Sequence, residues 1–195
     1  MAVNSNKTHK QGLVVKAGSK GFTLVELVVG MVVLSIALVM LTSMLFPQAD
    51  RAAETLHRVR SAELAHSVMN EIWGKRYDQN TNPNGGVPAC GAAARPDLGL
   101  PAGVATCTAP GNLGPDAGEN RNSYNDVDDY HGLNQNSLML NGGAGDTYAS
   151  HYPNYLLAVA VTYPDTSDLN RKLITVTVTT PSSEQIVYNA VRSNY

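Results

Sequence analysis

The sequence has few of the residues from which catalytic and metal sites are usually built. It contains two cysteines, which form neither a CxxC pair nor a metal-ligand set with the histidines. The five histidines are scattered, and neither an HExxH nor a GxSxG motif is present. The Gly-rich stretch NGGAGDTY (141–148) lacks the lysine of a phosphate-binding loop. We therefore expect a protein that is not an enzyme and that holds no cofactor.

Acidic residues are missing from the first 21 positions, which carry four lysines and a net charge of +4. The other 10 basic residues stand against all 16 acidic ones, so the rest of the chain has a net charge of −6. Positive charge before an apolar run stays in the cytoplasm, and the chain beyond the run crosses the membrane. The acidic exported part argues against nucleic acid as a partner, because phosphate binding needs clustered Lys and Arg.

An apolar run of 20 residues without charge, Leu27 to Phe46, comes after this leader. A helix of this length covers about 30 Å, the thickness of the hydrocarbon core. The run exceeds the roughly 7–15 residues of a secretory signal, and no clean A-x-A cleavage site comes after it. These features predict a single membrane anchor. Glu26, at its start, is unexpected because a charge within the bilayer costs about 2.5–3.5 kcal/mol.

The stretch KGFTLVEL (20–27) resembles the prepilin cleavage and methylation motif of type IV pilins and type II secretion pseudopilins. The resemblance implies that a prepilin peptidase and N-methyltransferase cuts after Gly21 and methylates Phe22. It also implies that Glu26 is neutralised by the N-terminal amine of a neighbouring subunit during filament assembly, since a costly buried charge becomes favourable when paired. The alternative is a glutamate that snorkels to the membrane interface.

Helical residue types continue from the membrane half (22–46) through 47–73, with a bend expected at Pro47 and an end at Trp73. The apolar side chains change face by about half a turn along this second part. They are first Ala49, Ala52, Leu56 and Val59, and then Leu64, Ala65, Val68 and Ile72. We infer that the first face packs on neighbouring helices and the second on the chain's own domain. An irregular apolar stripe is the alternative.

Residues 74–154 hold 13 of the 17 glycines and 7 of the 10 prolines, which is typical of loops. Cys90 and Cys107 lie in this region, and a single pair in an exported chain predicts a disulfide. Asp126, Asp128 and Asp129 supply oxygen atoms of the kind that Ca²⁺ prefers. Their spacing is not that of an EF-hand, so a solvated turn with aspartate caps is the expectation and calcium the alternative.

Residues 155–195 contain three β-rich runs with short connections: 155–163, 172–180 and 184–192. They predict an antiparallel meander. The first run is apolar on both faces, which indicates a central strand covered by the helix 47–73. The expected fold is therefore α+β, a long helix packed on a C-terminal antiparallel sheet, which is also the architecture that the pilin resemblance implies.

Several longer segments, including 37–80, GGVPAC (85–90) and NDVDDYHGLN (125–134), resemble the D-type minor pilins of the mannose-sensitive haemagglutinin (MSHA) pilus. This resemblance implies a minor subunit in pilus initiation or at an adhesive tip. It would lie in bacterial inner-membrane lipid with its C-terminal domain in the periplasm, and then assemble with other major and minor pilins. The alternatives are a minor pseudopilin of type II secretion and a signal-anchored periplasmic binding or enzymatic domain.

Overall fold

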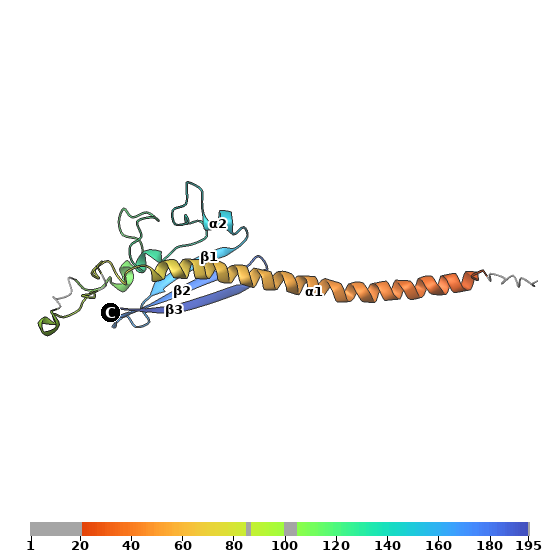
Figure 1. The fold of residues 1–195 in the computed structure, drawn as a ribbon, viewed down its shortest axis with the longest axis horizontal. Coiled ribbons are helices and arrows are strands. Elements are labelled where there is room, and N and C mark those ends of the chain that lie inside the picture. The colour runs from red at the N-terminus through yellow and green to blue at the C-terminus, as the bar shows by residue number, and fades with distance from the viewer. Residues whose placement is uncertain (1–20, 85–86, 100–104, 195) are drawn as a thin grey trace, which may run out of the picture. The chain divides into compact units, whose positions relative to one another are not determined.

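The computed structural model describes residues 21–84, 87–99 and 105–194 (Figure 1). Residues 1–20 of the expected leader lie outside the described residues. The elements run from the long helix α1 through short helices to the strands β1, β2 and β3, which confirms the expected α+β order. The chain divides into two units between Ala49 and Asp50, within the long helix.

Helix α1 spans Leu24–Trp73 and contains 50 residues. It ends at the predicted residue, where the Gly74 N–H donates to the carbonyls of Asn70 and Glu71. Pro47 lies inside the helix and does not end it. A proline at an interior position removes one helical hydrogen bond, but the good helix formers on both sides continue the element.

The sheet consists of β1 (Leu156–Thr162), β2 (Arg171–Thr179) and β3 (Gln185–Ser193). Neighbouring strands are antiparallel in the order β1-β2-β3, which confirms the meander. The expectation that the first run is the central strand was wrong, because β2 takes that place.

The outer edge of β1 is covered by a neighbouring segment of the chain. Here the Gly132 N–H donates to Val159 O at 3.0 Å, and the Val159 N–H donates to Leu133 O at 2.9 Å. A segment without regular strand structure thus satisfies the backbone of β1 on the side away from β2. The backbone edge of β1 is therefore protected, although its outward-facing residue Leu156 is 54% exposed.

The hydrophobic core of the Asp50–Tyr195 unit lies between the last turns of α1 and one face of the sheet (Figure 1). Alternate residues of β1 and β2 point into it, as the period-2 pattern of the second run predicts. The helix contributes the face expected to pack on the chain's own domain, and four of its residues are at most 1% exposed: Leu64, Ala65, Val68 and Ile72. By contrast, Leu56 and Val59 on the other face are 57% and 61% exposed.

The region between helix and sheet is built mainly from turns, as its glycine and proline content predicts. Its described part holds three 3-10 helices, η1 (Pro96–Leu98), η2 (Pro110–Asn112) and η3 (Asp128–Tyr130), and the short helix α2 (Tyr148–His151). The stretch 141–148 forms a tight turn in which a Cβ on Gly142 would lie 2.8 Å from the Asp146 Cβ. Glycine there serves the turn geometry.

Candidate functional site

The predicted cleavage and methylation residues lie just before the first turn of α1. Gly21, Phe22 and Thr23 are non-helical and exposed, and the Phe22 side chain is 82% exposed. A Cβ placed on Gly21 would meet no atom of the described residues within 4 Å. The peptide bond between Gly21 and Phe22 therefore lies in an open segment, as a proteolytic processing site requires.

Thr23 begins the helix by capping it, a role that the sequence reasoning missed. Its Oγ1 accepts a hydrogen bond from the Glu26 N–H at 3.3 Å, and its carbonyl accepts one from the Leu27 N–H at 3.1 Å. The spacing T-x-x-E is the pattern of a capping box, which could have revealed the helix start. Glu26 consequently lies in the first turn, where the helix dipole favours a negative charge.

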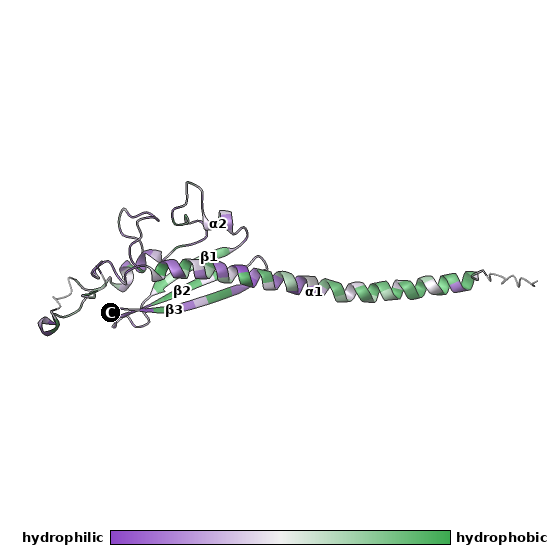
Figure 2. Ribbon diagram, viewed as in Figure 1, coloured by the Kyte–Doolittle hydropathy of each residue, from purple (hydrophilic) through white to green (hydrophobic). Residues whose placement is uncertain are grey.

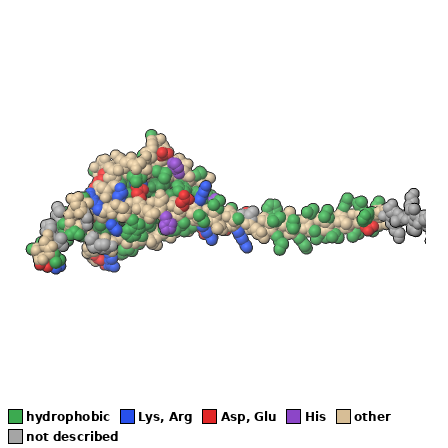
Figure 3. All heavy atoms as spheres, in the orientation of Figure 1, with side chains coloured by type: hydrophobic (Ala, Val, Ile, Leu, Met, Phe, Trp, Pro, Cys, Tyr) green, Lys and Arg blue, Asp and Glu red, His purple; other side chains and the backbone are tan. Residues whose placement is uncertain are grey.

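The part of α1 beyond Glu26 exposes apolar side chains all around the helix (Figures 2 and 3). From Leu24 to Phe46 every large apolar side chain is at least 50% exposed. Hydroxyl groups here donate to carbonyls one turn earlier: Ser35 to Met31, Thr42 to Leu38 and Ser43 to Met40. Among the described residues this is the one helix long and apolar enough to cross a membrane, and it fits membrane anchoring.

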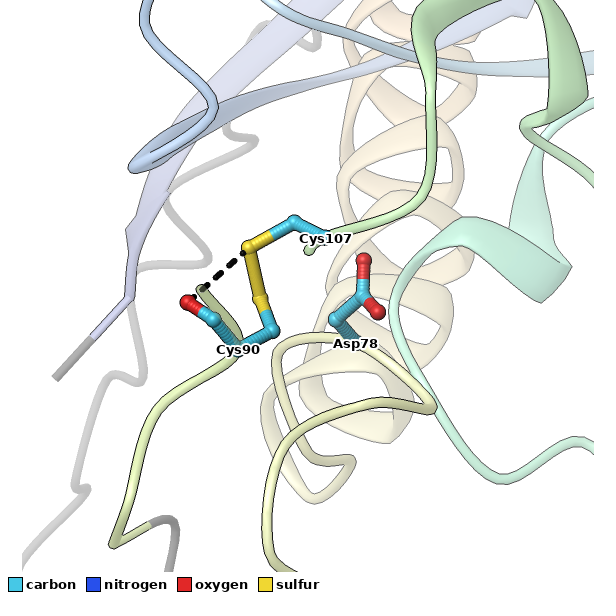
Figure 4. A group of neighbouring side chains, drawn as sticks. All are labelled: Asp78, Cys90 and Cys107. Carbon is cyan, nitrogen blue, oxygen red and sulfur yellow. Dashed lines mark hydrogen bonds between the residues drawn. A yellow bond between two sulfur atoms is a disulfide. The ribbon is translucent and has the colours of Figure 1, made fainter. Parts of the chain in front are cut away.

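The two cysteines form a disulfide in the structure, with Cα atoms 5.0 Å apart (Figure 4). They pack with Tyr77 and Leu169 in a small cluster separate from the main core. A side-chain oxygen of Asp78 lies within 4.8 Å of both sulfur atoms. This group is unsuited to a metal, because the ligand form of cysteine is the free thiolate.

Removal of the disulfide should loosen the region between helix and sheet. For the Cys90→Ser, Cys107→Ser double variant we expect the free energy of unfolding to fall by about 3 kcal/mol, the chain-entropy value for a loop of this size. The sheet should persist because its apolar contacts lie in the other cluster. Denaturant unfolding of the native and variant proteins measures the change. Alkylation of both thiols under non-reducing, denaturing conditions would show that no disulfide forms.

The three aspartates proposed for calcium are buried, and one of them contacts the start of β2. Asp128 is paired with Lys172, whose Nζ lies 2.6 Å from Asp128 Oδ1. The other two accept backbone N–H groups: Asp126 from Asp128, and Asp129 from Asn125 and Asp126. The expectation of a solvated turn was therefore wrong. The aspartates cap backbone N–H groups as expected, but the loop is buried and one aspartate is paired with a lysine. Calcium binding stays a prediction, but a protein cation already contacts one of its proposed ligands.

Lys172 also contacts Asp78, with 2.9 Å between its Nζ and Asp78 Oδ2. Burial alone would raise the pKa of Asp78, but Lys172 and two backbone N–H groups outweigh burial and lower it. For Asp126, burial and the neighbouring Asp128 raise the pKa to about 9. Burial also raises the pKa of Asp129, to about 6, against the opposing effect of its backbone hydrogen bonds. The cluster therefore contains a carboxyl group that keeps its proton at neutral pH.

A second buried ion pair fastens the same region to α1. Arg121 contacts both carboxylate oxygens of Glu71 at 2.6 Å, and the two side chains are only 6% and 13% exposed. Tyr130 donates its hydroxyl proton to Glu71 at 2.7 Å, and Arg121 donates to the Tyr148 hydroxyl at 3.0 Å. The hydrogen bond from Arg121 Nη2 to Glu71 and the hydrogen bonds with the two tyrosines help to compensate the burial of this ion pair.

Breaking this pair should destabilise the Asp50–Tyr195 unit strongly. Arg121→Met leaves the Glu71 carboxylate buried without its cation, and we expect a loss of about 3–5 kcal/mol in the free energy of unfolding. The matched control is Arg95→Met, because Arg95 pairs with Asp97 while both side chains are about 60% exposed. The control should change little, since exposed pairs contribute little. Equal effects of the two substitutions in thermal or denaturant unfolding would contradict the assignment.

Comparison with known proteins bears on the N-terminal segment. The family described as the prokaryotic N-terminal methylation motif matches residues 16–42. No curated protein and no solved structure matches the chain. The matched residues include Gly21, Phe22 and Glu26 and most of the apolar half of α1.

This motif implies processing by a prepilin peptidase and assembly with other pilins. The fold agrees, since a long N-terminal helix is followed by a three-stranded antiparallel sheet. The methylation motif and the α+β arrangement together support a pilin-type protein, a type IV pilin or a pseudopilin.

Proposed function

We propose that the chain is a minor pilin of an MSHA-type type IV pilus, without enzymatic activity, that acts in pilus initiation or at the adhesive tip. The observation that carries this proposal is the methylation motif at the start of a helix whose first half is apolar and exposed. The precursor would lie in the bacterial inner membrane with its C-terminal unit in the periplasm. After cleavage behind Gly21 and methylation of Phe22, the subunit would enter the filament.

The exposed apolar half of α1 explains how one surface serves both states. Before assembly it contacts lipid, and in the filament neighbouring helices replace the lipid. Lipid tails are as apolar as these side chains, so burial alone gives helices little reason to associate. The pairing of Glu26 with a neighbour's N-terminal amine would supply a directional attraction. Leu56 and Val59 would extend the contact beyond the membrane half.

The long loop region favours the role of a minor pilin with a binding function over that of a purely structural subunit. It spans 81 residues between helix and sheet, and it is anchored by a disulfide and buried ion pairs. Loops held on a rigid scaffold are where proteins commonly carry binding functions. The segments similar to D-type minor pilins of the MSHA pilus point in the same direction.

Pili sheared from cells provide the test. An immunoblot should find the protein in sheared pili at low abundance relative to the major subunit, and deletion of its gene should reduce surface pili. The runner-up, a minor pseudopilin of type II secretion, shares the methylation motif. It predicts unchanged pili and a loss of protein secretion instead. A mature chain that retains Gly21 would point to the third candidate, a signal-anchored periplasmic domain.

A further inference from the structure

The charge cluster around Lys172 has features that an ordinary ion pair does not require. The lysine is 0% exposed, and its Nζ contacts two carboxylates as well as the carbonyl of Tyr77 at 2.9 Å. The aromatic rings of Tyr77 and Tyr163 lie 4.6 Å and 5.8 Å from the same nitrogen. A primary amine and a carboxyl group are thus held in contact away from water.

We propose that Lys172 and Asp128 condense to an intramolecular amide, which links the Nζ of β2 to the Cγ of η3. The two groups are already at contact distance, with 2.6 Å between Nζ and Asp128 Oδ1. Two reactants that are fixed in this way gain an effective concentration of about 10⁵–10⁸ M over the same reaction between free molecules. The low exposure of both side chains keeps water, the product, from driving the reaction back.

Two neighbouring carboxylates, Asp78 and Asp126, hold the reacting groups in position. Asp78 holds the Lys172 nitrogen in place, and the backbone N–H groups of Asn80 and Thr108 hold Asp78 in turn. Asp126 lies beside the reacting carboxyl group, and its Oδ1 accepts the backbone N–H of Asp128 at 3.0 Å.

The reaction balances without any external reagent. One ammonium proton passes to the Asp128 carboxylate along the 2.6 Å contact, and the neutral amine of Lys172 then attacks the Asp128 Cγ and forms the new C–N bond. The C–O bond to one carboxyl oxygen of Asp128 breaks, and that oxygen leaves as water with the two protons that the Lys172 nitrogen gives up. The sum is one ammonium and one carboxylate converted to one amide and one water. No atom is oxidised or reduced.

The bond would fasten the sheet to the loop region at a point remote from the disulfide in sequence. The disulfide joins residues 17 apart, whereas Lys172 and Asp128 are separated by 44 residues. A subunit whose sheet and loops are joined covalently resists local opening, which is useful in a filament that bears mechanical load. This consequence rests on the proposed filament role, but the bond itself does not.

Intact-mass spectrometry of the full-length mature protein, extracted in detergent, tests the proposal. We expect the chain to be lighter than its disulfide-bonded sequence by one water molecule. After reduction and digestion, one branched peptide should contain both Lys172 and Asp128. A mass without the loss of water, with the two residues recovered in separate peptides, would overturn the proposal. A branch to Asp78 would equally overturn the assignment of Asp128.

Two variants check the chemistry. Lys172→Arg keeps a cation for both carboxylates but lacks the primary amine, and it should recover the full unmodified mass. Asp128→Ala removes the carboxyl carbon that the amine would attack, and it should likewise show no loss of water. Loss of water that persists in Lys172→Arg would contradict the proposal. The wild-type mass decides the question even if a variant fails to fold.

Discussion

Glu26→Ala should insert into the membrane and be cleaved normally, yet be missing from pilus fractions. The substitution removes a costly group from the apolar segment and leaves Gly21 and Phe22 available to the peptidase. Loss of one partner from a buried ion pair costs about 3–5 kcal/mol. Because each 1.4 kcal/mol is about tenfold in association, we expect incorporation to fall by more than about 100-fold. Immunoblots of sheared pili beside the membrane fraction measure it.

Two further variants separate charge from shape at this position. Glu26→Gln keeps a hydrogen-bonding side chain without charge, and it should fail less completely than alanine. Val25→Ala trims an exposed apolar neighbour and should assemble nearly as well as the native chain. Normal incorporation of Glu26→Ala would mean that the glutamate only lies at the membrane interface or supports the helix start.

Substitution of Gly21 with a bulky residue such as leucine should leave the precursor uncut. A peptidase must bring the backbone close to its catalytic groups, and only glycine lacks a Cβ. Within this chain the substitution meets no atom within 4 Å, so its effect should lie in recognition rather than in folding. The uncut precursor should appear as a larger band on a denaturing gel.

Gly30→Ala is the matched control, since a Cβ at Gly30 also meets open space. Gly30 lies within the helix and away from the predicted cleavage point, so this variant should be processed normally. Normal cleavage of Gly21→Leu would contradict the prepilin interpretation. Failure of both variants would point to a general effect on membrane insertion.

The elements with strong periodicity were predictable from sequence. In the second β-rich run, alternating apolar positions predicted a half-buried strand, and Ile174, Val176 and Val178 are indeed fully buried. The change of apolar face along the helix predicted that the turn around Val68 packs on the chain's own domain, and Val68 is part of the core that includes the sheet. Both signals are local, because they depend only on spacing along one element. Strand order depends on contacts between elements, which spacing does not reveal. For this reason β1 was wrongly predicted to be the central strand.

The buried ion pairs were not predicted, because their partners are far apart in sequence. Glu71 and Arg121 are separated by 50 residues, and a lone charge within a loop is ordinarily expected to be solvated. One signal was available: Lys172 has the same parity as Ile174, Val176 and Val178, so strand alternation places it on the buried face. A lysine on that face needs acidic partners, and the aspartates of the loop region were the candidates.

The central claim is that this chain is a prepilin-type subunit, and its mature N-terminus tests that claim most directly. Mass spectrometry of protein extracted from membranes should find a chain that begins at Phe22 and carries a methyl group on its α-amine. The leader and Gly21 should be absent from the mature protein. A mature chain that still contains Lys20 and Gly21, or that begins at an unmodified residue elsewhere, would contradict the account.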